Sequence, residues 1–340
     1  MDDATLQSGC IPAAPSGFRS GFVGIIGRPN VGKSTLMNQL VGQKIAITSP
    51  IAQTTRNRLR GILTTPEAQI IFVDTPGIHK PHHQLGEVLV RNARLAIASV
   101  DVVLFVVDAS VEAGGGDRFI IDLLTNIKTP VILGLNKADQ QVSHEPQTAN
   151  CNPIAAEERE PQPASGHESE IAPHPFDQTY ARLVTAHPWQ IVKFSALTGE
   201  GLEALQSLLI QQLEGGPYYY PPDLVTDQPE RFIMGELIRE QILLQTREEV
   251  PHSVAIAIDR VDEEPTITRV LATINVERPS QKAILIGKGG SMLKEIGSAA
   301  RQQMQKLIAG KIYLELFVKV QPKWRQSRTQ LAEFGYRVED

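Results

Sequence analysis

Cysteine is scarce in this chain, with only Cys10 and Cys151 in 340 residues. Both lie in stretches without regular pattern, which excludes a disulfide framework and a cysteine-rich zinc site. No apolar run approaches the about eighteen residues that indicate a transmembrane helix. Residues 1–20 also lack the charged and apolar blocks of a secretory signal peptide. These absences predict a cytoplasmic protein without a transmembrane segment.

The length and the charge pattern predict how the chain is divided. A chain of 340 residues is typical of about two domains, and an apolar fraction of 41% is enough for real cores. Residues 140–178 carry seven acidic and one basic side chain and are rich in Pro, Glu, Ser and Ala. Such a segment cannot bury enough apolar surface to offset its ordering entropy. We therefore expect a disordered acidic insertion there.

Residues 27–34, Gly-Arg-Pro-Asn-Val-Gly-Lys-Ser, match the pattern G-x-x-x-x-G-K-[ST]. They follow an expected buried strand, 22–26, and precede an expected helix, 35–41, which is the setting of a phosphate-binding loop. Glycines let backbone N–H groups turn toward phosphates at the positive end of the helix. Lys33 can reach the β- and γ-phosphates, and the Ser34 hydroxyl can ligate Mg²⁺. The sequence thus predicts a nucleotide-binding protein.

The base is predicted by Asn136-Lys137-Ala138-Asp139, which follows the apolar strand 130–134. The Asp139 carboxylate can accept from both N1–H and the N2 amino group of guanine, whereas adenine offers neither donor there. Asn136 is expected to brace neighbouring loops, and the stem of Lys137 to lie along the base. Residues Ser195-Ala196-Leu197 follow the strand 191–194 and suit the O6 edge of guanine. Together these motifs favour GTP and GDP.

Two further segments are expected to sense the γ-phosphate. Asp74-Thr75-Pro76-Gly77 follows the apolar strand 70–73, so Asp74 can hold Mg²⁺ through water and the Gly77 N–H can bond the γ-phosphate. The polar segment 49–56 is interpreted as the other switch loop. It offers Thr55 as a second Mg²⁺ ligand, with Thr54 as the alternative.

A catalytic glutamine is missing. In the best-known GTPases a Gln after the switch glycine orients the attacking water, but this chain has Ile78 there. Hydrolysis is therefore expected to be slow, or to be helped by backbone groups, a monovalent cation or a partner. His79, His82 and His83 follow closely, and a polar loop explains them better than a role as substitute bases.

The pattern changes after residues 215–222, where glycines, prolines and three tyrosines interrupt regular structure. The tyrosines are interpreted as a linker packed against a domain surface rather than as a base-stacking site. Beyond it we expect, in order, a helix at 230–245, strands at 254–258 and 267–274, a short helix, the loop 287–290, a helix at 291–308 and a strand at 312–320. This αββααβ order, with a basic G-x-x-G loop between two helices, predicts a type II KH domain that clamps single-stranded RNA.

The combined motifs resemble the Era family of bacterial GTPases. The resemblance covers about residues 21–320 and rests on GRPNVGKST, AQTTR, DTPGIHKP, NKAD, SAL, Glu230-Arg231-Phe232 and Ile286-Gly287-Lys288-Gly289-Gly290. It implies a GTP-gated protein that binds the 3′ end of 16S rRNA during 30S subunit assembly. It also implies that a hydrophobic residue replaces the catalytic Gln, matching Ile78, and that Asn30 can help to hold a potassium ion.

The expected architecture is a P-loop GTPase domain, with a mostly parallel sheet and helices on both faces, followed by an α+β type II KH domain. The expected boundaries are a disordered tail 1–20, a GTPase domain 21–216 with the acidic insertion 140–178, a linker 217–229, a KH domain 230–330 and a tail 331–340. Candidate catalytic residues are Lys33, Thr55, Asp74 and Gly77. Candidate nucleotide-binding residues are Gly27, Arg28, Pro29, Asn30, Val31, Gly32, Lys33, Ser34, Thr35, Asp74, Thr75, Pro76, Gly77, Ile78, Asn136, Lys137, Ala138, Asp139, Ser195, Ala196 and Leu197. Candidate RNA-binding residues are Ile286, Gly287, Lys288, Gly289, Gly290 and Lys294.

Two other hypotheses stay open at this point. One is a GTPase switch whose C-terminal domain binds a protein or a membrane rather than rRNA. For the RNA-binding GTPase itself, peripheral contact with the inner face of the cell membrane also stays open. The other is an RNA-binding adaptor with a vestigial nucleotide site, against which Lys33, Ser34, Asp74 and Asp139 all argue. We expect a monomer.

Overall fold

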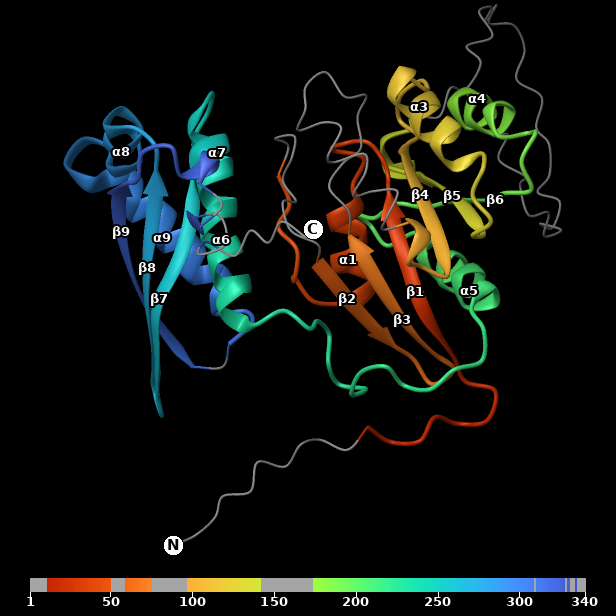
Figure 1. The fold of residues 1–340 in the computed structure, drawn as a ribbon, viewed down its shortest axis with the longest axis horizontal. Coiled ribbons are helices and arrows are strands. Elements are labelled where there is room, and N and C mark those ends of the chain that lie inside the picture. The colour runs from red at the N-terminus through yellow and green to blue at the C-terminus, as the bar shows by residue number, and fades with distance from the viewer. Residues whose placement is uncertain are drawn as a thin grey trace, which may run out of the picture.

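The structure is a computed structural model that describes residues 11–49, 59–74, 97–141, 174–308, 310–327, 329–330 and 334. Within these ranges the chain forms two units, each built on its own sheet and joined by a linker (Figure 1). The expected switch residues Thr54 and Thr55, together with Thr75 to Ile78 and the three histidines after them, lie outside the described residues.

The first unit is built on a six-stranded sheet with the order β2-β3-β1-β4-β5-β6. Only β2 runs antiparallel to its neighbour, and the other neighbouring strands are parallel. The strands are β1 (Arg19–Ile26), β2 (Leu59–Thr64), β3 (Ala68–Asp74), β4 (Val102–Asp108), β5 (Val131–Asn136) and β6 (Gln190–Lys193). Strand β4 up to Val107, strand β5 up to Leu135 and residues 70–73 of β3 are continuous apolar runs because a parallel sheet is covered on both faces. The expected mostly parallel sheet is confirmed.

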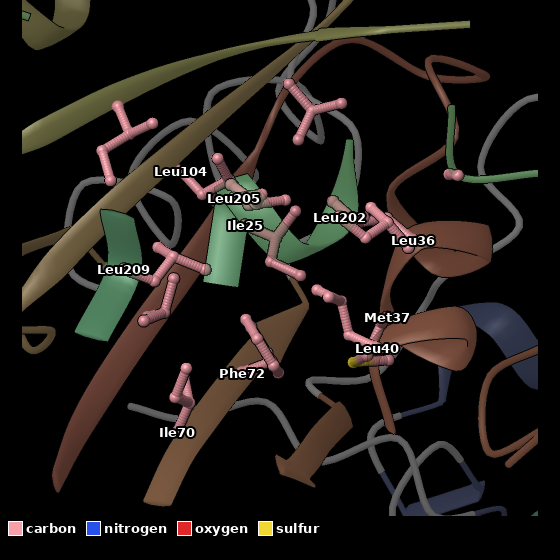
Figure 2. Packing of buried hydrophobic residues seen from close by; sticks show 14 of the residues in the cluster. Ile25, Leu36, Met37, Leu40, Ile70, Phe72, Leu104, Leu202, Leu205 and Leu209 are labelled. Carbon is pink, nitrogen blue, oxygen red and sulfur yellow. The ribbon is translucent and has the colours of Figure 1, made fainter. Parts of the chain in front are cut away.

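Helices cover both faces of this sheet. The core on one face packs α1 (Lys33–Val41) and α5 (Leu202–Gln212) against the strands, as Figure 2 shows for Leu36, Leu205 and Phe72. The core on the other face packs α3 (Gly115–Leu124) and α4 (Pro175–Leu183). The loops that follow β1, β3, β5 and β6 leave the carboxyl ends of parallel strands. They therefore meet at one edge of the sheet, where α/β proteins bind ligands.

Two expected boundaries of this unit were wrong. Residues up to Ser20 were expected to form a disordered tail, but β1 begins at Arg19 and Phe18 is buried. The acidic insertion was expected to extend to Gln178, yet α4 begins at Pro175, and Asp177 is buried. Asp177 accepts hydrogen bonds from Gln141 Nε2 and Lys193 Nζ at 2.7 Å each. These long-range bonds offset the polarity that made the segment look unstructured.

The linker is packed along the first unit, as expected for its tyrosines. The ring of Tyr218 lies 4.4 Å from that of Phe18, and the Gln69 amide oxygen accepts from Tyr219 N–H at 2.7 Å. Farther along, Ile62 N–H donates to Val225 O at 2.8 Å. Figure 1 shows the linker running from α5 past β2 and β3 to α6. The linker therefore fixes where the second unit begins.

The second unit has a three-stranded sheet in the order β7-β8-β9, with β7 antiparallel and β9 parallel to β8. Its elements are α6 (Glu230–Gln245), α7 (Val250–Ser253), β7 (Ala255–Glu264), β8 (Ile267–Val276), α8 (Pro279–Ile286), α9 (Ser291–Met304) and β9 (Lys311–Val320). The expected order is confirmed, with the short α7 added. Helix α9 ends four residues earlier than expected. Ile238 of α6, Ile296 of α9 and Ile274 of β8 share one core.

Candidate nucleotide site and RNA-binding loop

The phosphate loop spans residues 27–32, between the end of β1 and the start of α1. Gly32 has φ +97°, and a Cβ there would lie 2.3 Å from Asn136 Nδ2. A Cβ on Gly27 would lie 2.3 Å from the carbonyl oxygen of Val106. Both positions therefore require glycine. The loop places its backbone at the N-terminus of α1, where the helix dipole favours an anion.

Two backbone carbonyl groups hold Lys33 inside this loop. Its Nζ donates to the carbonyl oxygens of Gly27 at 3.1 Å and Arg28 at 2.8 Å. Burial lowers the pKa of Lys33 from 10.5 to about 8, and the Asp74 carboxylate opposes the shift. A buried ammonium group is costly, and the Asp74 carboxylate offsets only part of that cost. Phosphate oxygens would supply further negative charge beside it.

This pKa predicts that GDP binding takes up a proton at alkaline pH. Below pH 8 Lys33 is protonated in the free protein. Bound phosphates raise its pKa, so above pH 8 the complex holds a proton that the free protein lacks, and affinity falls by up to about tenfold per pH unit. Titrations between about pH 7 and 9 with GDP and with GMP, which does not reach Lys33, test this. Parallel losses for both nucleotides would contradict it.

The residues present fit a magnesium ion at the other end of the loop. The Ser34 hydroxyl, at the start of α1, donates to Asp74 Oδ2 at 3.1 Å. Asp74 ends β3 and is fully buried. Hydroxyl and carboxylate oxygens are the hard donors that Mg²⁺ prefers. The fold therefore brings together two of the three expected metal residues, and Thr55 lies outside the described ranges.

Asn136 ties three loops together, as expected. Its Nδ2 donates to Val31 O in the phosphate loop at 2.7 Å. Its Oδ1 accepts from the N–H of Ala196, which follows β6, at 2.9 Å. Asn136 is almost fully buried at the end of β5, so these bonds are shielded from water. The phosphate loop and the two expected guanine loops are thus held as one site.

Asp139, the carboxylate expected to bind guanine, is oriented by a hydrogen bond. The Ser195 hydroxyl donates to Asp139 Oδ1 at 2.5 Å, and Ser195 itself is fully buried. Lys137 has a left-handed backbone, φ +67°, and its Nζ contacts Asp108 Oδ2 at 2.5 Å. Leu197 is 69% exposed, which leaves it free to cover a ligand.

Asp108 was not identified from the sequence, although a signal was present. It ends the apolar strand β4, just as Asp74 ends β3. Its side chain also accepts from the Ser110 hydroxyl at 2.5 Å. A carboxylate at the end of a buried parallel strand is therefore informative even without a named motif. Here it positions the lysine of the N-K-x-D loop.

The second unit presents its G-K-G-G loop between α8 and α9. Gly287, Gly289 and Gly290 have φ values of +71°, +62° and +82°. A Cβ on Gly289 or Gly290 would meet no protein atom within 4 Å. Packing within the protein therefore does not explain why Gly289 and Gly290 lack side chains, whereas a Cβ on Gly287 would lie 2.8 Å from Met292 Cβ. Open space together with a left-handed backbone is what a close approach of a nucleic acid backbone requires.

The positive charge of this loop is accessible. Lys288 lies in the loop and Lys294 one turn into α9, and both side chains are exposed. Ile284 on α8 is 50% exposed, while Ile286 is partly buried. The loop also precedes the N-terminus of α9, where backbone N–H groups and the helix dipole favour phosphate. An apolar edge beside a cationic loop suits single-stranded RNA.

Comparison with known protein families agrees with this geometry. Residues 22–137 match the family described as 50S ribosome-binding GTPase, and residues 249–325 match the KH domain family. The chain is 72% identical to the GTPase Era of a Nostoc species over 330 residues, covering 97% of this chain and 93% of that protein. It is 68% identical to the GTPase Era of Rippkaea orientalis over 334 residues, covering 98% of each.

Solved structures give the same result for both units together. A crystal structure of Era with MgGDPNP and nucleotides 1506–1542 of 16S ribosomal RNA is 36% identical, with a TM-score of 0.79, covering 94% of this chain and all of that one. A substituted Aquifex aeolicus Era bound to GDP and aluminium fluoride has a TM-score of 0.80 at the same identity and coverage. The chain therefore belongs to the Era family of GTPases.

Proposed function

We propose that this chain is a GTP-gated RNA-binding protein that binds the 3′ end of 16S rRNA during assembly of the 30S subunit. The observation that carries the proposal is the presence, in one chain, of a phosphate loop and an open G-K-G-G loop on packed units. The Era complex with MgGDPNP and a 16S rRNA fragment supports it. A monomeric, cytoplasmic protein is part of the proposal.

The proposed site assigns one task to each loop. Residues 27–35 hold the phosphates, with Lys33 at the β- and γ-phosphates. Residues 136–139 and 195–197 hold guanine. Ser34, Asp74 through water and Thr55 hold Mg²⁺, and residues 74–78 sense the γ-phosphate. Support comes from the bonds of Asn136, which join the phosphate loop to the third guanine segment.

A buried carboxylate connects the two units and supports the gating. Glu240 of α6 is 1% exposed and accepts from Lys44 Nζ at 2.5 Å and from Thr48 N–H at 2.8 Å. Asn38 Oδ1 of α1 holds the N–H of Ala46 in the same loop at 2.8 Å. Helix α1 begins at the phosphate loop, and α6 packs on α9, which begins at the G-K-G-G loop. In this proposal, these contacts are the route by which a shift at one loop reaches the other.

Crosslinking tests the RNA partner directly. The GTP-bound protein is crosslinked to total RNA, and the bound fragments are sequenced. We expect fragments from the 3′ end of 16S rRNA. A set of unrelated RNAs without that fragment would contradict the proposal, because a G-x-x-G clamp leaves base edges to be read.

The alternative is a GTPase whose C-terminal unit binds a protein or a membrane. The observation that favours it is the exposure of Tyr313 and Phe317 on β9, at 48% and 53%. Across the described part of the chain, no helix is long and apolar enough to cross a membrane. Co-sedimentation with anionic lipid vesicles, compared with capture on single-stranded RNA, distinguishes the two functions.

We also propose that potassium assists hydrolysis, because Ile78 offers no group to orient water. Asn30 lies in the phosphate loop with φ +65°. In this proposal its side chain helps to hold the ion, as the resemblance to the Era family implies. Replacing potassium with sodium should slow GTP turnover while leaving GDP affinity nearly unchanged. Ile78→Ala is the control, since removing an apolar side chain should alter turnover only slightly. Equal turnover in both salts would exclude a role for potassium.

A further inference from the structure

Arg28, the second residue of the phosphate loop, is anchored outside the loop. Its Nε donates to Asp117 Oδ1 at 2.7 Å. Asp117 lies in the first turn of α3 and is fully buried, whereas the Arg28 side chain is 28% exposed. The two residues are 89 positions apart, and no sequence motif links them. The pair joins the phosphate loop to the opposite face of the sheet.

Asp117 is held by three separate groups. Besides Arg28, its Oδ2 accepts from the Gly114 N–H at 2.9 Å and from the Tyr180 hydroxyl at 3.4 Å. Burial, with the nearby Asp117 charge, raises the pKa of Tyr180, so this hydroxyl keeps its proton. It shares that proton between Asp117 Oδ2 and the carbonyl oxygen of Asp108, which lies at 3.2 Å. A buried carboxylate that accepts from several donors is held in one position. Arg28 is thus tied to a fixed point.

A glycine run makes room for the Arg28 side chain. A Cβ on Gly116 would lie 2.7 Å from Arg28 Cδ, so any side chain there would displace the arginine. A Cβ on Gly115 would meet nothing within 4 Å. Gly116 is therefore required by the ion pair, and Gly115 is not. The chain supplies a matched pair of positions in one helix turn.

The ion pair leads directly to the lysine that would hold the phosphates. Arg28 O accepts from Lys33 Nζ at 2.8 Å, and the preceding carbonyl, of Gly27, accepts at 3.1 Å. Anchoring the Arg28 side chain fixes this peptide and hence the direction of the ammonium group. Fixed donors act at a phosphate without reorganisation, which is how such sites stabilise charge.

We propose that Asp117 is a positioning residue of the GTPase: through Arg28 it fixes the carbonyl groups that aim Lys33 at the β- and γ-phosphates. This inference rests on the proposed nucleotide site. A buried ion pair adds little net stability by itself, but removing one partner leaves the other uncompensated. Loss of Asp117 would therefore release Arg28 and loosen the aim of Lys33, while the guanine loops keep their own bonds.

The test compares Gly116→Ala and Asp117→Asn with the control Gly115→Ala. Affinities for GMP, GDP and GTP are measured by competition against fluorescent GDP. Both test variants should lose about tenfold or more in GDP and GTP affinity, the size of a lost charged hydrogen bond. They should keep their GMP affinity, because Lys33 does not reach the α-phosphate. The Gly115→Ala control should match wild type.

A second measurement separates positioning from general loosening. In a Lys33→Ala background, Gly116→Ala should cause no further loss of GDP affinity, because the group it misaligns is already gone. Equal losses for GMP and GDP, or an undiminished effect in the Lys33→Ala background, would overturn the inference. Gly116→Ala leaves the bonds from Gly114 and Tyr180 to Asp117 in place. This variant therefore still tests the proposal if Asp117→Asn does not fold. Failure of the wild type to bind GDP would instead refute the nucleotide site itself.

Discussion

Asp139→Asn should lower the affinity for GTP by at least about a hundredfold and raise that for the xanthine nucleotide. The carboxylate is expected to accept two hydrogen bonds from guanine, and each bond to a charged group contributes about 1.5–3 kcal/mol. The amide offers an NH₂ group, which opposes the N2 amino group of guanine but suits the carbonyl oxygen that xanthine has there. Equilibrium titration with both nucleotides measures the exchange.

The structure sharpens this prediction through Ser195. Because the Ser195 hydroxyl donates to Asp139 Oδ1, the amide oxygen of the variant should keep that bond and turn its NH₂ toward the base. Ser195→Ala is the matched control: it removes the orienting bond but keeps the carboxylate, so it should weaken GTP binding without any gain for xanthine. Recovery of affinity with the xanthine nucleotide shows that the variant is folded. Unchanged GTP affinity in Asp139→Asn would mean that the guanine site lies elsewhere.

The arrangement of the nucleotide loops could be predicted from the sequence because the topology of a parallel sheet determines where the loops lie. Each motif follows an apolar strand, and parallel strands bring their carboxyl ends to one edge of the sheet. The bond from Asn136 to Val31 spans 105 positions, yet it follows once both residues lie at that edge. The helix 230–245 was predicted with its observed limits because its apolar stripe is long and its start follows a proline.

The pairs that could not be predicted join residues without periodicity. Arg28 with Asp117 and Lys44 with Glu240 are ion pairs between elements whose packing no local pattern encodes. The start of α4 at Pro175 was missed because its polar sequence is typical of a disordered segment. In the folded chain, Asp177 of this helix forms an ion pair with Lys193. Contacts with distant residues determine whether such a segment forms a helix, and a single sequence does not show which residues will be in contact.

Lys288→Asp combined with Gly289→Asp should lower the RNA affinity by about a hundredfold or more, while the GTP affinity stays nearly unchanged. Gly289 has φ +62°, a conformation that Asp tolerates better than most residues. The space beside it is open, so the free protein should accept the new side chain. The RNA backbone would then meet two carboxylates where it needs a cation and no Cβ. Filter binding with single-stranded RNA gives the affinity.

The same domain supplies a matched control at Gly310 and Lys311. Gly310 has φ +98°, and its Cβ would meet only one atom within 4 Å, at 3.9 Å. Lys311 is exposed at the start of β9. Gly310→Asp with Lys311→Asp makes the same change of charge and volume away from the loop. If both pairs weaken RNA binding equally, the effect is net charge, which acts on RNA without a clamp.

The final expectation concerns the link between the two sites. RNA should bind more tightly with a non-hydrolysable GTP analogue than with GDP, and linkage requires bound RNA to raise affinity for the analogue relative to GDP by the same factor. The contact through Glu240 is the described route for this coupling, so Glu240→Gln, which removes the charge facing Lys44, should reduce the ratio of the two RNA affinities. Lys288→Asp with Gly289→Asp should remove RNA binding in both nucleotide states. Equal RNA affinities with GDP and the analogue in the wild type would mean that the phosphate loop and the G-K-G-G loop work independently on one chain.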